Sequence, residues 1–162
     1  MKENIAILLS VIATLVTVLN FAISIYRSRV KLSLRVIDYS KFELGNGFSV
    51  YMSFTNLSHL PVAITNIRVK AGSQYIDCSH IPEIAMELKK RSGEKVEYTE
   101  RIWTKTLPIN LQPLGGSSGF LVFSMPEYIS PPGPKDLIFQ VSPNRGKAFE
   151  ISLEPDHIQF VK

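Results

Sequence analysis

The sequence predicts a mainly β protein in which one N-terminal transmembrane helix is followed by an antiparallel β-sandwich. Three observations carry this prediction. Residues 5–25 form an uncharged run of 21 residues, which as a helix spans about 30 Å of hydrocarbon. After residue 29, apolar and polar side chains alternate with a period of two in short segments. Gly, Pro, Asn and Ser residues separate these segments at the spacing expected of a sandwich.

The predicted helix covers residues 5–26 and follows a short tail of residues 1–4. Tyr26 takes the interfacial position at the end of the apolar run. A cleaved signal peptide is the alternative interpretation. Against it, the run is longer than a signal-peptide core, and Lys2 before it is neutralised by Glu3. We therefore expect a retained membrane anchor.

Residues 27–35 form a basic juxtamembrane segment that leads into the first strand of a β domain covering residues 30–162. Its four cations suit anionic lipid headgroups, and they are Arg27, Arg29, Lys31 and Arg35. Because positive charge is retained on the cytoplasmic side, they predict a single-pass cell-membrane protein with a cytoplasmic domain. The net charge of +4 gathers near this segment, since seven basic and two acidic residues lie between residues 27 and 71. This distribution argues against nucleic acid as a partner.

Small and polar residues repeat along one face of the predicted helix with spacings of 4 and 3, which is the two-position seam of a heptad. The seam consists of Ala6, Ser10, Ala13, Thr17, Asn20 and Ser24. Small side chains let helices approach closely in lipid, and hydroxyl and amide groups bond across the seam. The pattern predicts a transmembrane association face for a homo-oligomer or for another membrane protein. The alternative is that such residues are merely tolerated in the helix.

The soluble part is predicted to contain eight or nine short strands with an inward-facing core. The expected strands or extended segments are residues 30–36, 48–54, 62–69, 74–78, 107–114, 120–125, 137–141, 149–153 and 157–161. The expected core includes Leu32, Leu34, Phe54, Ile64, Val122 and Phe139. Residues 115–119 are expected to form a turn. Residues 81–102 fit either a short helix, by their 3–4 spacing, or a hairpin, by their alternation.

Four short motifs occur in an order typical of a known class of domain. They are Asn56-Leu57-Ser58, Pro61-Val62-Ala63-Ile64, Leu111-Gln112-Pro113 and Phe120-Leu121-Val122-Phe123. In the order of these motifs the chain resembles bacterial immunoglobulin-like β-sandwich modules over residues 30–125. The resemblance implies a domain that binds or spaces rather than catalyses, and often one that lies outside the cell.

The sequence predicts no catalytic residue, no cofactor and no metal site. Cys78 is the single cysteine, and with His80 it offers two ligands where a structural zinc site needs four. A nucleophile elbow and a phosphate-binding loop are both missing from the sequence. The glycosylation acceptor pattern at Asn56 is interpreted as a chance match in a turn.

These observations predict a non-enzymatic interaction module, which serves as a subunit or scaffold of a membrane complex and associates through its helix. Trp103, between Arg101 and Lys105, is the candidate partner anchor, and the alternative is that it caps the core. Two other functions stay open. One is an exported, envelope-facing binding domain, which the resemblance favours, and the other is an unrecognised hydrolase.

Overall fold

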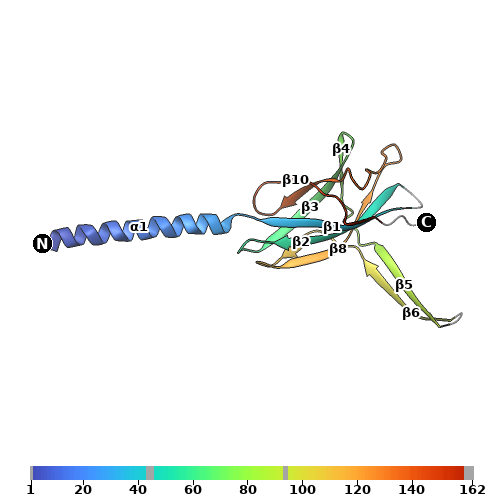
Figure 1. Cartoon of the computed structure of the whole chain (residues 1–162), viewed down its shortest axis with the longest axis horizontal. Helices are drawn as coiled ribbons and strands as arrows, with labels where there is room; N and C mark the ends of the chain where they lie inside the picture. The colour runs from blue at the N-terminus through green and yellow to red at the C-terminus, as the bar shows by residue number, and fades with distance from the viewer. Residues whose placement is uncertain (1, 43–45, 93–94, 159–162) are drawn as a thin grey trace.

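The computed structural model describes the backbone of residues 2–42, 46–92 and 95–158, and the side chains there except those of residues 2–6, 8, 26–28, 89–92, 95–97 and 157–158. One helix and eleven strands lie within this part of the chain (Figure 1). They are α1 (Lys2–Ser28), β1 (Leu32–Lys41), β2 (Gly47–Asn56), β3 (Val62–Ala71), β4 (Gln74–Asp77), β5 (Ile84–Ser92), β6 (Lys95–Trp103), β7 (Ile109–Leu111), β8 (Gly116–Ser124), β9 (Ile138–Pro143), β10 (Phe149–Ser152) and β11 (His157–Ile158).

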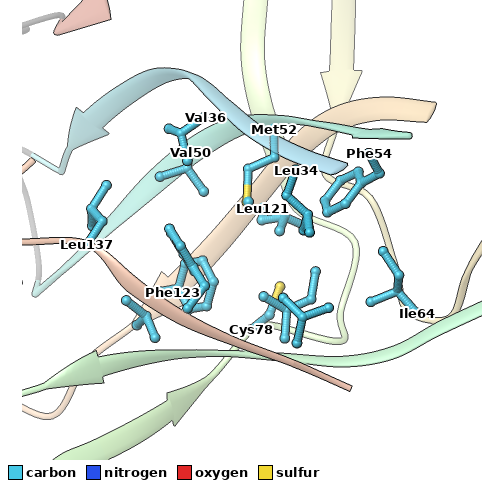
Figure 2. Packing of buried hydrophobic residues seen from close by; sticks show 14 of the residues in the cluster. Leu34, Val36, Val50, Met52, Phe54, Ile64, Cys78, Leu121, Phe123 and Leu137 are labelled. Atoms are coloured by element: carbon cyan, nitrogen blue, oxygen red, sulfur yellow. The ribbon is translucent and has the colours of Figure 1, made fainter. Parts of the chain in front are cut away.

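Two sheets face each other across a hydrophobic core, so the prediction of a mainly β protein is confirmed (Figure 2). The first sheet has the order β11-β1-β2-β8. The second has the order β10-β9-β3-β4, with β7 also paired to β3. All pairs in these sheets are antiparallel except β1–β11, which is parallel. The expectation of purely antiparallel pairing is therefore wrong at that edge.

Alternation of side chains determines which face of β2 packs against the core. Its even-numbered residues Phe48, Val50, Met52 and Phe54 are fully buried and belong to the core cluster, and Figure 2 labels the last three. The register of β1 against β2 shifts between Val36 and Asp38, which marks a β-bulge. This shift changes the alternation along β1, so that both Val36 and Tyr39 are buried.

The predicted core residues are mostly where the alternation places them. Leu34, Phe54, Ile64 and Phe139 belong to the core cluster, and Leu32 packs against it partly buried. Val122 is buried but lies outside that cluster. The amide of Ser79 donates to the Val122 carbonyl oxygen at 2.8 Å, so the chain leaving β4 runs along the edge of β8.

α1 projects away from the two sheets as a separate rod (Figure 1). It begins at Lys2 and ends at Ser28, so residues 2–4 of the predicted tail belong to the helix. Large hydrophobic side chains are exposed along its described length, including Leu15 at 64% and Phe21 at 67%. Among the residues that the structure describes, no helix meets the length and hydropathy needed to cross a membrane.

The ambiguous stretch 81–102 forms the hairpin β5–β6, and the helical alternative is wrong there. Its two strands form a sheet of their own that stands out from the sandwich (Figure 1). The pairing runs from Ile84 opposite Trp103 to Ser92 opposite Lys95. Of the predicted Ser92-Gly93 turn, Ser92 is the last residue of β5 and Gly93 lies outside the described residues.

Two other segments differ from expectation. Residues 116–119 belong to β8 rather than to a turn, because they pair with β2 from Thr55 to Met52. A Cβ atom at Gly119 would overlap the Lys105 side chain, so the glycine serves a close approach rather than a change of direction. In the expected strand 157–161, β11 covers 157–158, and residues 159–161 lie outside the described residues.

Candidate functional site

The seam of α1 is exposed wherever the structure describes it. Ser10, Ala13, Thr17, Asn20 and Ser24 all face solvent, and the side chain of Ala6 lies outside the described part. The Thr17 hydroxyl donates to the Ala13 carbonyl oxygen at 2.8 Å. Thr17 therefore offers a partner helix its small size rather than an unused donor. The Asn20 amide is the most polar group of the seam.

The four predicted headgroup cations do not act as one set. Arg29 and Lys31 are exposed in the neck between α1 and β1. Arg35 lies on β1, where its Nε is 2.5 Å from the Asp156 carboxylate. The Arg27 side chain lies outside the described residues. Arg29 and Lys31 therefore stay together in the neck, while Arg35 joins β1 to the segment before β11.

A cleft of about 740 Å³ opens beside the neck and brings in two cations that sequence reasoning missed. Its basic side chains are Arg29 and Lys31 from the neck and Arg145 and Lys147 from the loop between β9 and β10. Its other lining residues are Val30, Leu32, Pro143, Gly146 and Phe149. The only sequence signal was the turn at Pro143-Asn144-Arg145-Gly146, which says nothing about what the loop contacts.

The loop between β9 and β10 is held against the rest of the domain. The Asn144 amide donates to the Ala63 carbonyl oxygen at 2.7 Å, and the Asn144 side chain accepts from the Ala63 amide at 2.9 Å. Gly146 has φ +89°, a conformation that favours glycine, and a Cβ atom there would lie 3.7 Å from Val30. These contacts fix the loop tip beside the neck.

Asn56 is the polar centre of the same end of the domain. Its side chain is fully buried at the end of β2. Nδ2 donates to the carbonyl oxygens of Leu60 at 2.9 Å and Gln112 at 3.0 Å, and Oδ1 accepts from the Ser58 amide at 2.9 Å. The side chain thus ties the loop after β2 to the segment after β7. Burial of this side chain agrees with the chance interpretation of the glycosylation pattern.

The hairpin β5–β6 is clamped at its root and open along its length. The Lys105 amide donates to the Phe120 carbonyl oxygen at 2.7 Å, and Thr104 and Glu83 exchange two hydrogen bonds of 2.9 Å. Beside and beyond this root several large apolar side chains are exposed, among them Leu88 at 47% and Trp103 at 53%. A two-stranded hairpin is marginal alone in water, so this exposed apolar surface is a candidate binding surface.

Cys78 has a buried thiol with a raised pKa. Its side chain is 1% exposed within the core, and burial raises the pKa of its thiol to about 11. A neutral buried thiol is neither a nucleophile nor a metal ligand. His80 is exposed, and the described residues hold no cluster of His, Cys, Asp or Glu suited to a metal ion.

The chain matches no protein-family model, no curated protein and no solved structure. A proposal about function therefore rests on three surfaces of the described chain. They are the exposed helix α1, the cationic cleft at the neck and the projecting hairpin β5–β6.

Proposed function

We propose that this chain is a single-pass membrane protein whose β domain is a non-enzymatic interaction module, held at the membrane by α1. The observation that carries the proposal is where the large exposed hydrophobic side chains lie. Eleven of them, from Ile7 to Ile25, are on α1, and five more, from Ile84 to Trp103, are on the hairpin. Both elements project from the sandwich, and both leave an apolar surface for something other than this domain to cover.

We place α1 in the lipid bilayer because its exposed aliphatic residues do not lie along one stripe of the helix. Leu15, Val16, Val18 and Leu19 are each more than half exposed although they point in different directions around the helix. A helix that is hydrophobic all round is a buried or membrane-spanning one. The uncharged run of the sequence also continues beyond the described side chains, back to Ile5.

We also propose that the domain has an immunoglobulin-like fold. The order β1-β2-β8 opposite β10-β9-β3-β4 corresponds to strands A, B and E opposite G, F, C and C′ of that fold. In this correspondence the hairpin β5–β6 is an insertion where strand D would otherwise lie. The insertion presents Trp103, which supports its proposed role as a partner anchor.

The domain is proposed to be cytoplasmic, and an introduced thiol tests both anchoring and sidedness. Ser73 lies in the exposed turn between β3 and β4, and we expect Ser73→Cys to react with a membrane-impermeant thiol reagent only after the cells are permeabilised. The expected reason is retention of the neck cations on the inner side. The protein should also stay in the membrane fraction after an alkaline carbonate wash.

The unsubstituted chain is the matched control, because buried Cys78 should stay unlabelled in both samples. Labelling of Ser73→Cys in intact cells would place the domain outside and favour an exported, envelope-facing binding domain. Release by carbonate would overturn anchoring by α1.

The seam is proposed to pack against a second copy of α1 or the helix of another membrane protein. Asn20→Leu should weaken self-association about threefold, because membrane hydrogen bonds average about 0.6 kcal/mol. Ser10→Leu with Thr17→Leu should weaken it further, since added bulk separates the two backbones. A transmembrane association reporter, or energy transfer between labelled chains in vesicles, measures both effects.

The control pair is Val11→Leu with Val18→Leu, which repeats the seven-residue spacing off the seam. It should leave association unchanged. Equal damage from the seam pair and the control pair would rule out a specific face.

A further inference from the structure

Cations from two distant parts of the chain meet at the end of the sandwich from which α1 emerges. Arg29 and Lys31 line one side of the cleft, and Arg145 and Lys147 line the other. Among the described residues that line this cleft, every charged side chain is basic. A second cleft of about 370 Å³ shares Arg29 and Lys31, and it is bounded by Ala22 and Ile23 of α1. The cationic site is therefore continuous with the apolar helix.

Exposed leucines gather at the same end. Leu57 is 52% exposed, Leu60 is 41% exposed and Leu114 is 63% exposed. The Leu57 amide donates to the Lys31 carbonyl oxygen at 2.8 Å, and the Leu114 amide donates to the Ser58 carbonyl oxygen at 3.2 Å. These bonds place the leucines beside the neck and the cleft. The end of the domain nearest α1 therefore combines apolar and cationic groups.

Leu114 is held in a conformation that leucine rarely adopts. Its φ is +54°, in the left-handed region that glycine occupies without cost. Such backbone strain costs about 1–3 kcal/mol and persists where the surrounding structure imposes it. Here it presents a bulky apolar side chain to the outside, at a position where glycine would be unstrained. Leucine at a strained and exposed position fits a role for the side chain itself.

We propose that this end of the sandwich docks on the membrane surface and holds the phosphate of an anionic phospholipid headgroup in the cleft between the neck and the β9–β10 loop. The inference rests on the proposed anchoring by α1. Guanidinium and ammonium groups bind phosphate by charge-assisted hydrogen bonds, while the leucines enter the interface around them. Arg145 Nη1 donates to the Pro61 carbonyl oxygen at 3.3 Å, which positions the guanidinium group beside the cleft.

The test uses the full chain in nanodiscs of phosphatidylcholine that contain a minority of phosphatidylglycerol. Native mass spectrometry of the ejected protein reports which lipid it retains. We expect phosphatidylglycerol to be retained in preference. Arg29→Gln with Lys147→Gln should lower this retention about 25-fold, because each cation at an anionic surface strengthens binding about fivefold.

Lys41→Gln with Lys135→Gln is the matched control, since both lysines are exposed away from the cleft. Equal loss in this pair would reduce the effect to diffuse charge and overturn the site. Leu114→Gly separates docking from folding, because it should reduce retention while the unfolding temperature holds or rises. Unchanged retention in this variant would exclude the leucines from docking and overturn that part of the proposal.

A further arm separates a lipid from free phosphate. Inorganic phosphate added to the discs should not displace phosphatidylglycerol, because it lacks the contact with the interface. Displacement at equal phosphate concentration would identify a free-phosphate site and overturn the lipid assignment. Failure of the unsubstituted chain to enter the discs would overturn the anchoring, whereas entry without lipid preference would overturn this inference alone.

Discussion

Asn56→Ala is expected to lower the free energy of unfolding by about 3 kcal/mol. The buried side chain makes hydrogen bonds to Ser58, Leu60 and Gln112. Alanine would leave the buried Ser58 amide without its acceptor, whereas the carbonyl oxygens of Leu60 and Gln112 each lose one of two donors. A buried unsatisfied group costs about 1–3 kcal/mol and a lost hydrogen bond about 0.5–1.5 kcal/mol, which sets the expected total.

Denaturant unfolding of the full chain in detergent measures this loss. Asn110→Ala is the matched control, because Asn110 is exposed on the adjacent strand β7 and should change stability by less than about 0.5 kcal/mol. The loss should be accompanied by faster hydrogen exchange at Leu57 and Leu114, whose loops Asn56 ties together. A cost as small as the control's would mean that water replaces the side chain fully.

Phe123→Ala is expected to destabilise the domain by about 3–5 kcal/mol, the usual range for a buried aromatic residue. The Phe123 ring is fully buried between the sheets (Figure 2). Its centroid lies 5.1 Å from that of Phe48 in the first sheet and 5.9 Å from that of Phe139 in the second. Its removal opens a cavity at the point where the two sheets contact each other, and neither sheet can close it alone.

Phe120→Ala provides the control on the same strand. Phe120 packs against Tyr51 at 4.7 Å between ring centroids but is only partly buried. It should cost about 1 kcal/mol, because an aromatic pair outside the core contributes about that much. Thermal or denaturant unfolding compares the two. Equal costs for the two alanine variants would argue against a core located between the sheets.

Period-two alternation predicts most of the strands and most of the core. It worked for β2 and β9 because each is buried on one face, so that Phe54 and Phe139 occupy inward positions. It was less informative for Val122, whose outward position on β8 is covered by the chain leaving β4. Cover of that kind depends on a contact between distant segments, which a local pattern does not contain.

The hairpin and the cleft show where local reasoning fails for a physical reason. None of the described side chains in residues 84–88 and 98–103 belongs to the core cluster, so the spacing there satisfies helix and strand alike. The two hydrogen bonds between Thr104 and Glu83 close the root of the hairpin that forms. Arg145 and Lys147 lie far along the chain from Arg29, and only the register of β9 against β3 brings their loop to the neck. The turn predicted at residues 115–119 is wrong for a similar reason, because Gly119 lies within β8 and allows the close approach of the Lys105 side chain.

The placement of α1 and the hairpin also determines how the domain would respond to mechanical force. A pull between the membrane and a partner on the hairpin would enter at Leu32, where β1 begins. β1 is joined to β2 by nine residue pairs, from Leu32 opposite Asn56 to Lys41 opposite Phe48. Tension along the strand axis shears these pairs together instead of unzipping them one at a time. The domain should therefore resist a steady load between its two attachments much better than a pull applied across the strands.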